Sequence, residues 1–345
     1  MGRYAIEATR ALIAARPDWR FTVFTNRPEL VAGTGAAVRS TRLPADRAAA
    51  RVAWLHAAAV ADGAARRADC WVSMAFTLPV WWRGPAVVTI HDLVFIDHDD
   101  TYSSRLRAAY AARATRAAAK RASAVVCGSA ETRERLTAVL GTPPGRVSVV
   151  PYGVSDAFQP AAIAGDAGAG GFVLAVGTFE PRKGLDTLHA AMRRLNASRA
   201  EPVQLVVAGR PGWGAEATVA ALRADPNVTV VEGPSDDELA ELYRGAGLLA
   251  FPSRAEGFGL PVAEAMACGC PVVSSDLPSV REFAGDAPIY VAVGDDSALA
   301  EAVASMLDDA ETRRRHVARG VELASGLRWK RVGETIAGLV EKATV

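Results

Sequence analysis

This 345-residue sequence contains few cysteines and no long apolar run. An apolar stretch of ~20 residues, the length that spans a bilayer as a helix, is absent, and the amphipathic start RYAIEATRALIAA lacks the pattern of a secretory signal. The cysteine spacing fits no metal site, and Cys268 and Cys270 are expected to be small packing residues in the reduced cytosol rather than a redox pair. We therefore expect a cytoplasmic protein. The four cysteines are Cys70, Cys127, Cys268 and Cys270.

The sequence also lacks the phosphate-binding motifs of two large enzyme classes. No P-loop of the form G-x-x-x-x-G-K-[ST] is present, and GRPGWG at 209–214 has the wrong spacing for the G-x-G-x-x-G fingerprint of a nicotinamide-dependent dehydrogenase. Zinc-finger spacing and a basic stripe interleaved with aromatic residues are missing too. We therefore expect no nucleic acid partner.

The near-neutral total charge conceals two halves of opposite sign. Residues 1–160 hold 21 Lys and Arg residues against 13 Asp and Glu residues, a balance of +8. The remainder holds 18 against 25, a balance of −7. This asymmetry indicates two domains with different partners.

Short apolar runs alternate with alanine-rich helical stretches throughout the chain. Continuous apolar strands alternating with helices indicate parallel sheets that are covered on both faces. The predicted fold class is α/β, with two doubly wound, Rossmann-like domains facing a central cleft, where ligands meet the carboxyl ends of strands. We predict strands at residues 21–25, 70–76, 86–90, 123–128, 147–151, 172–177, 203–209, 228–232, 248–253, 271–275 and 288–293.

A Pro-, Ala- and Gly-rich segment, residues 159–171, is the predicted linker between the domains. It separates a domain of residues 1–158 from a domain that begins at residue 172. The first domain opens on the helical stretch MGRYAIEATRAL without the strand that usually feeds it. We expect that its first strand is missing, and that the natural start lies upstream of Met1 or the chain is truncated.

Two glutamates flank a glycine-rich turn in the segment EGFGLPVAEAMACG. Glu256 precedes the turn, and Glu264 lies about one turn into the helix that follows. Gly257 and Gly259 allow backbone N–H groups to approach a ligand closely. The two carboxylates suit sugar hydroxyls and would repel phosphate. The alternative interpretation is a capped helix with an incidental glutamate.

The stretch VGTFEPRKGLDTL supplies the cations that a phosphate group requires. Arg182 and Lys183 stand in a short loop between a strand that ends at Gly177 and the following helix. A guanidinium fork and a movable ammonium together suit a diphosphate. A solvated helix start is the alternative.

These two segments, together with VVTIHDL, VPYGV and RWKRVGETIAGL, resemble the retaining glycosyltransferases of the GT-B fold, specifically glycosyltransferase family 4 (glycosyl transferases group 1), with its E-x7-E motif. The likeness covers nearly the whole chain. It implies transfer of a sugar from a nucleotide diphosphate sugar with retained configuration, without a cofactor or a metal. The donor would bind the second domain, residues 172–328, and the acceptor the first, while the helix at 329–345 crosses back to the first domain.

The resemblance implies a role for each site residue. Arg182 and Lys183 would bind the diphosphate, Glu264 the ribose, and Glu256 the transferred sugar. His91 would reach the donor sugar from the opposite domain, although a core histidine at a strand end is the alternative. The nucleobase is expected near Gly209–Pro211 and Gly233–Asp236. Further donor-binding residues implied are Gly2, Arg3, Gly177, Gly209, Arg210, Gly257, Phe258, Gly259 and Leu260.

The substrates are less sharply indicated than the reaction. The form GTFEPRKG resembles a subgroup that uses GDP-mannose, so a mannosyltransferase of bacterial polysaccharide biosynthesis is favoured, with a glycan, lipid-linked or small-molecule acceptor. A non-catalytic nucleotide-sugar-binding protein and a GT-B sugar-nucleotide epimerase are the alternatives. A covalent role for Glu256 is rated below same-face attack by the acceptor.

Two further features have competing interpretations. Asp97-His98-Asp99 imitates a D-x-D metal motif, but it lies in the basic half, far from the cationic loop. The acid-free helix SSRLRAAYAARATRAAAKRA would rest on anionic lipid at the inner face of the plasma membrane, bind a phosphorylated acceptor, or present a solvated basic face. Its basic residues are Arg105, Arg107, Arg113, Arg116, Lys120 and Arg121.

Overall fold

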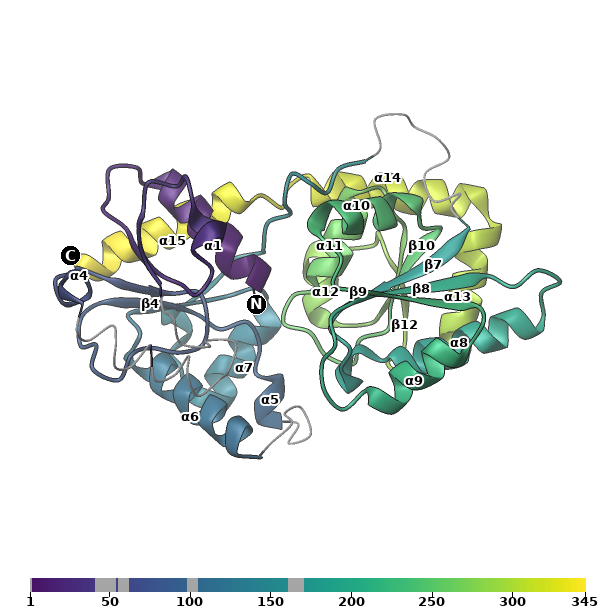
Figure 1. The fold of residues 1–345 in the computed structure, drawn as a ribbon, viewed down its shortest axis with the longest axis horizontal. Coiled ribbons are helices and arrows are strands. Elements are labelled where there is room, and N and C mark those ends of the chain that lie inside the picture. Colours follow the sequence, from purple (N-terminus) through teal and green to yellow (C-terminus); the bar gives the residue numbers. More distant parts are fainter. Residues whose placement is uncertain (1, 41–53, 55–61, 98–104, 161–170) are drawn as a thin grey trace. The chain divides into compact units, whose positions relative to one another are not determined.

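The computed structural model describes residues 2–40, 54, 62–97, 105–160 and 171–345 (Figure 1). The chain divides into two compact units. The first comprises Met1–Leu93, Ala109–Gly153 and Arg328–Val345, and the second comprises Val94–Ala108 and Val154–Leu327. None of the described helices combines the length and the apolar character that crossing a bilayer requires. The central cleft expected between the domains stays a prediction.

The first unit contains two parallel sheets. The larger has the strand order β3-β4-β5-β6, and its strands β4 and β5 are completely buried, as their unbroken apolar sequences require. The smaller sheet pairs β1 with β2. The strands are β1 (Thr22–Phe24), β2 (Ala37–Arg39), β3 (Trp71–Ser73), β4 (Ala86–Thr89), β5 (Ala124–Cys127) and β6 (Val147–Val149).

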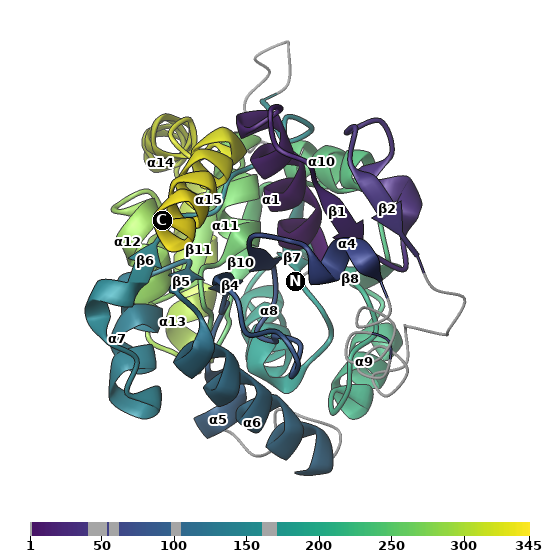
Figure 2. The same cartoon turned by 90° about the vertical axis from the view of Figure 1, so that its left-hand side faces the viewer.

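The first and last helices of the chain lie side by side in this unit (Figure 1 and Figure 2). Gly333 permits this contact, because a Cβ atom there would lie 2.3 Å from the Ala11 carbonyl oxygen. The helices of this part of the chain are α1 (Gly2–Ala15), α4 (Gly63–Arg66), α5 (Val94–Asp97), α6 (Arg105–Arg121), α7 (Ala130–Leu140) and α15 (Trp329–Thr344). Of these, α5 and the first turn of α6 group with the second unit.

The second unit is built on a six-stranded parallel sheet with the order β12-β11-β10-β7-β8-β9. The chain starts in the centre at β7, runs outward to β9, and then returns to β10 on the other side of β7. The order of strands therefore reverses between β7 and β10. The strands are β7 (Phe172–Val176), β8 (Gln204–Gly209), β9 (Val228–Glu232), β10 (Leu248–Phe251), β11 (Val272–Ser275) and β12 (Ile289–Val291).

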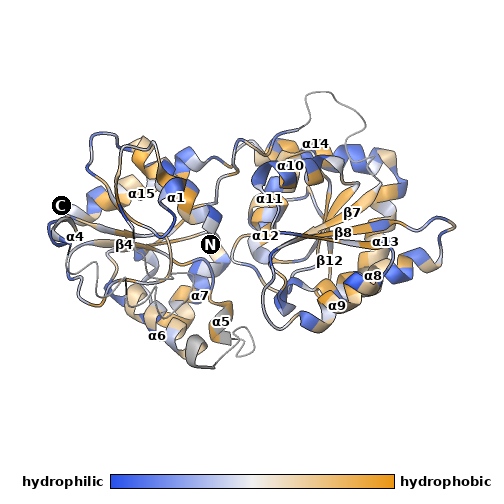
Figure 3. Cartoon of the chain, in the orientation of Figure 1, coloured by the Kyte–Doolittle hydropathy of each residue, from blue (hydrophilic) through white to orange (hydrophobic). Residues whose placement is uncertain are grey.

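Helices cover both faces of this sheet, with α8, α9 and α13 on one face and α10, α11 and α14 on the other (Figure 1). The strands are mainly hydrophobic, and many hydrophilic residues lie on the helices (Figure 3). One core cluster joins Leu188 and Met192 of α8 to Val207, Leu248 and Val303. The helices are α8 (Leu185–Ala197), α9 (Glu216–Ala224), α10 (Asp236–Gly245), α11 (Leu260–Ala267), α12 (Pro278–Ala284), α13 (Asp296–Asp308) and α14 (Ala310–Ala324).

All eleven predicted strands are present, most of them trimmed by one or more residues. Strand β2 was not predicted, because its sequence Ala-Val-Arg is short and has two exposed residues. In the described residues no strand precedes α1, and the sheets β1-β2 and β3-β4-β5-β6 are separate. Cys268 and Cys270 are buried free thiols, as expected of packing residues, and burial raises the pKa of Cys268 to about 12.

Candidate active site

Two loops meet where the strand order of the second sheet reverses. Strands β7 and β10 are parallel neighbours, so their carboxyl ends lie at the same edge. The first loop continues β7 through residues 177–184, and the second continues β10 through residues 252–259. A crevice outside the carboxyl ends at such a reversal is the usual ligand site of a doubly wound sheet.

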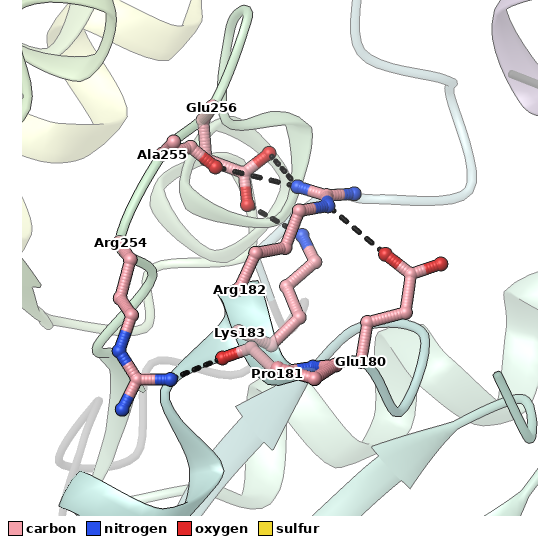
Figure 4. Close-up of polar contacts among 7 residues, drawn as sticks. All are labelled: Glu180, Pro181, Arg182, Lys183, Arg254, Ala255 and Glu256. Carbon is pink, nitrogen blue, oxygen red and sulfur yellow. Dashed lines mark hydrogen bonds and ion pairs between the residues drawn. The ribbon is translucent and has the colours of Figure 1, made fainter. Parts of the chain in front are cut away.

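Arg182 and Lys183 of the first loop contact Glu256 of the second (Figure 4). Lys183 Nζ donates to Glu256 Oε1 over 2.5 Å, and Arg182 Nη1 lies 3.1 Å from Glu256 Oε2. Arg182 also donates through Nε to Glu180 Oε2 over 2.9 Å and through Nη1 to the Ala255 carbonyl over 3.3 Å. Residues 73 positions apart in sequence thus form one charged cluster.

The centre of this cluster is nearly buried, which strengthens its electrostatic interactions. The side chains of Lys183 and Glu256 are 9% and 10% exposed, and that of Arg182 is 25% exposed. Burial alone would raise the pKa of Glu256, but the charges of Lys183 and Arg182 outweigh it and lower the pKa to about 2. Burial lowers the pKa of Lys183, and the negative charge of Glu256 opposes that change. The carboxylate is therefore ionised at neutral pH and the cations stay close to it.

Backbone contacts hold the two loops together. The Arg254 guanidinium donates to the Pro181 carbonyl (Figure 4), and the Arg254 amide donates to the Arg182 carbonyl over 2.7 Å. The guanidinium also pairs with Asp186. Gly184 has a φ of 63°, and a Cβ atom there would lie 2.1 Å from the Pro252 carbonyl oxygen. Only glycine fits this position without strain.

A contact from α12 anchors the Glu256 loop, because the Ser279 hydroxyl donates to the Glu256 carbonyl over 2.8 Å. Gly259 ends the loop with a φ of 101° and leads into α11, whose first residue is Leu260. Gly257 and Phe258 are buried, and the Phe258 ring stacks on Phe283 with centroids 4.4 Å apart. Phe258 therefore contributes its side chain to packing, which leaves only its backbone for the expected donor contact.

Glu264 lies on α11 and is 1% exposed. The Tyr243 hydroxyl on α10 donates to its Oε2 over 3.1 Å, and this tyrosine is itself fully buried. Sequence reasoning missed Tyr243, because nothing in its local pattern sets it apart from a packing residue.

The ends of β7, β8 and β9 are joined by glycine backbone. Gly177 N donates to the Ala208 carbonyl over 3.0 Å, and Gly233 N donates to the Gly209 carbonyl over 2.6 Å. A Cβ atom on Gly209 would lie 1.8 Å from the Gly177 carbonyl oxygen, so these loops approach closely only because Gly209 lacks one. Arg210 is exposed beside a groove of about 380 Å³ that includes Pro211, Gly212 and Glu232 in its lining.

His91 follows β4 in the first unit and has both ring nitrogens engaged. Nδ1 lies 2.7 Å from the Tyr152 hydroxyl and Nε2 lies 3.1 Å from the Met74 carbonyl oxygen. Burial lowers the pKa of His91 to about 4. Tyr152, 61 positions away, was not singled out, although its motif VPYGV was recognised.

Gly2 and Arg3 are also in the first unit, where they are the first residues of α1. The helix predicted for this stretch therefore includes both residues. Their role near the donor phosphates stays a prediction.

The basic helix α6 exposes only part of its predicted charge. Arg113, Arg116 and Lys120 are exposed. Arg121 instead donates to the Pro79 carbonyl over 3.0 Å and to the Trp82 carbonyl. Arg121 is half-buried, and its guanidinium is hydrogen-bonded to backbone, so it is less open than the other three. Its part in a membrane contact stays a prediction. The side chains of Arg105 and Arg107 lie outside the described residues, as do His98 and Asp99 of the D-x-D-like stretch, whose Asp97 ends α5.

Each half of the chain matches a known protein family. Residues 1–158 match the family described as Glycosyltransferase Family 4, and residues 165–322 match the family described as Glycosyl transferases group 1. The two matches together cover nearly the whole chain, which therefore belongs to the family 4 glycosyltransferases. The family indicated by the E-x7-E segment and the cationic loop is thereby confirmed.

Its curated relatives include mannosyltransferases. The chain is 32% identical over 163 residues to O-antigen chain mannosyltransferase B of Escherichia coli, covering 46% of this chain and 43% of that protein. It is 33% identical over 209 residues to MMP alpha-(1->4)-mannosyltransferase of Mycolicibacterium hassiacum, covering 58% of this chain and 49% of that protein. The matches thus span less than half the length of these two relatives.

Solved structures with the same fold extend over nearly the whole chain. Sucrose-phosphate synthase from Thermosynechococcus elongatus has a TM-score of 0.77 at 21% identity, covering 97% of this chain and 91% of that chain. HepE from Anabaena, in complex with UDP and glucose, has a TM-score of 0.75 at 19% identity, covering 97% and 95%. The chain therefore has the GT-B fold, as the sequence predicted.

Proposed function

We propose that this protein is a retaining, metal-independent glycosyltransferase of bacterial polysaccharide biosynthesis. It transfers a hexose, with mannose favoured, from a nucleotide diphosphate sugar to a glycan, lipid-linked or small-molecule acceptor. The contact of Arg182 and Lys183 with Glu256 at the strand reversal carries the proposal. The names of the relatives and the UDP and glucose of HepE support a hexose donor.

The charges of the cluster match the charges that the reaction develops. Breaking the bond at the anomeric carbon leaves negative charge on the phosphate and positive charge on the sugar ring. Arg182 and Lys183 would stabilise the departing diphosphate, and one such preorganised donor lowers the barrier by about 2–4 kcal/mol. Ionised Glu256 would stabilise the sugar ring. The acceptor hydroxyl attacks from the same face, and its proton passes to the leaving phosphate oxygen.

The transfer assay tests the assignment directly. Lys183→Ala and Glu256→Gln should each lower turnover by a factor on the order of 100 or more. Arg194→Ala is the control, because it removes an exposed ion pair with Asp296 outside the site. Near-normal turnover in either site variant would refute the assignment. Donor binding without transfer would identify a non-catalytic binding protein, and an epimerised donor would identify an epimerase.

Product analysis tests the finer claims. An NMR spectrum of the product should show the anomeric configuration of the donor, and an inverted product contradicts retention. Activity should persist in EDTA, since the proposal assigns the neutralisation of the diphosphate to Arg182 and Lys183. Loss of activity in EDTA that Mg²⁺ or Mn²⁺ restores contradicts metal independence.

The nucleobase is proposed to bind near Gly209–Pro211 and Gly233–Asp236, at the carboxyl ends of β8 and β9. The groove of about 380 Å³ that includes Pro211 offers room next to this edge. GDP, UDP and dTDP sugars can be ranked by thermal shift, because a ligand at 100 times its Kd adds about 2.7 kcal/mol of stability. A larger shift with GDP-mannose would support the favoured donor, and a larger shift with another nucleotide contradicts it.

A peripheral membrane contact through α6 is proposed for Arg113, Arg116 and Lys120. Each basic side chain near an anionic surface contributes about 1 kcal/mol. The protein should float with vesicles that contain anionic lipid and remain unbound with neutral vesicles. Replacing all three residues by glutamine should abolish flotation, and flotation that is unchanged would place the contact elsewhere.

A further inference from the structure

Tyr152 and Met74 fix the chemistry of His91 from opposite sides of its ring. A carbonyl oxygen only accepts hydrogen bonds, so the contact of 3.1 Å with the Met74 carbonyl requires a proton on Nε2. In a neutral imidazole Nδ1 is then the acceptor, and the Tyr152 hydroxyl donates to it over 2.7 Å. The two partners together select one tautomer.

The surroundings keep both partners in these roles. Burial raises the pKa of Tyr152 well above its ordinary value, so the phenol keeps the proton that it donates. Burial lowers the pKa of His91 to about 4, so the imidazole is neutral at pH 7. Other titratable groups near Tyr152 are Tyr4 on α1, Cys127 on β5 and Asp92 after β4.

Packing restricts the rings as well. The Tyr4 ring stands edge-on to His91 with centroids 4.7 Å apart, and Tyr152 stacks on Trp329 with centroids 6.5 Å apart. Tyr152 therefore remains in place through its ring contacts even without its hydroxyl. Removing the hydroxyl therefore tests its contact with His91 while the ring contacts stay.

We propose that Tyr152 is a positioning residue that holds His91 as its Nε2–H tautomer, so that His91 serves transfer as a neutral hydrogen-bond donor to a sugar hydroxyl and not as a base. The inference rests on the proposed function, which gives His91 a sugar contact. The Nε2 hydrogen bonds to the Met74 carbonyl, and a sugar hydroxyl would share or replace that acceptor.

Two matched variants separate this role from simple packing. Tyr152→Phe removes the hydroxyl that contacts His91. Tyr4→Phe removes a hydroxyl from the same aromatic cluster, but that hydroxyl contacts Thr89 Oγ1, at 3.1 Å, instead of His91. Both variants keep their rings, so their effects on packing are comparable.

The first readout needs no substrate. Long-range ¹H–¹⁵N NMR of the wild-type protein, with His91 assigned from a His91→Gln variant, should show Nε2 protonated and Nδ1 unprotonated. Tyr152→Phe should show a mixture of tautomers, while Tyr4→Phe should resemble the wild type. A protonated Nδ1 in the wild-type protein overturns the inference without any variant, as do equal tautomer changes in the two variants.

The second readout is transfer. Tyr152→Phe should lower kcat about tenfold, which is the rate change expected when one neutral hydrogen bond is lost from the transition state. The affinity for nucleoside diphosphate should be unchanged. Unchanged kcat together with a changed tautomer overturns the role in transfer. If the wild-type protein transfers no sugar from any donor, the proposed function fails, whereas the NMR result still decides whether Tyr152 sets the tautomer.

Discussion

At the residue scale, the decisive feature is that Glu256 pairs with both cations that the proposed function assigns to the diphosphate. Lys183 and Arg182 both contact its carboxylate at 2.5 and 3.1 Å. A buried charge is costly unless it is paired, so this contact explains how two cations remain at a site with little solvent. If the diphosphate binds there as proposed, it competes with a resident anion.

Glu256→Gln should therefore bind a sugar-free nucleoside diphosphate more tightly than the wild type, although it transfers no sugar. We expect Kd to fall about tenfold, because the variant removes the competing charge and one charge-assisted contact contributes about 1.5–3 kcal/mol. Isothermal titration measures this. Glu180→Gln, which removes the charge that pairs with Arg182 but leaves Glu256 in place, should give a smaller gain. Weaker binding in Glu256→Gln would contradict the competition.

His91 gives a second residue-scale expectation, on stability against pH. Its pKa falls from 6.5 to about 4 on folding, so between these values the unfolded chain binds a proton that the folded chain does not. Stability from this group is therefore complete above pH 6.5 and lost as the pH falls towards 4, by at most about 3 kcal/mol. Melting curves of His91→Gln should lose less stability over this range, and parallel curves would contradict the assignment.

At the element scale, two loops from neighbouring strands make the site, and glycines set how closely they approach. β7 ends at Val176 and β10 ends at Phe251, and their pairing brings the loops to one edge. Gly184 then lies against the Pro252 carbonyl oxygen. The position of Lys183 therefore depends on a residue that carries no charge.

Gly184→Ala tests this dependence, with Gly141→Ala as its control. Both glycines are left-handed, with φ values of 63° and 65°, but a Cβ atom meets the Pro252 oxygen at position 184 and nothing within 4 Å at position 141. Both variants carry the same backbone strain, so the difference between their stabilities measures the clash with the Pro252 oxygen. We expect Gly184→Ala to be less stable than the control by about 1–3 kcal/mol and to transfer poorly. Equal melting temperatures would show that the loop yields.

At the scale of the whole molecule, the two ends of the chain belong to the same unit, because the first and last helices pack against each other. The strand pairs and helix packing of each unit follow from apolar patterning. The closure of α15 on α1 depends instead on a close backbone approach at Gly333.

Gly333→Ala should push α1 and α15 apart and lower the stability of the first unit by at least about 1–3 kcal/mol. Gly338→Ala, in the same helix, is the control, since a Cβ atom there meets nothing within 4 Å. That variant should stabilise the helix by up to about 1 kcal/mol, because alanine favours helix. Chemical denaturation of both variants measures the difference, and two variants of equal stability would contradict a tight helix contact.

The sequence alone determined the alternation of strands and helices, the family and the pair of segments that carry the charged residues. The burial of an apolar run such as LLAFPS can be predicted from its own sequence. Arg182, Lys183 and Glu256 stand in motifs with fixed spacing. Even there, β2 escaped because three residues with two exposed side chains carry almost no periodic signal.

Tertiary structure alone decided which groups are partners. Arg121 looks like surface charge in sequence but satisfies carbonyls about 40 residues away. Tyr152 meets His91 across 61 residues, and Tyr243 meets Glu264 across 21. Such pairs arise when strands and helices from distant parts of the chain come together, and a local pattern encodes only whether a residue is buried, not which residue will face it.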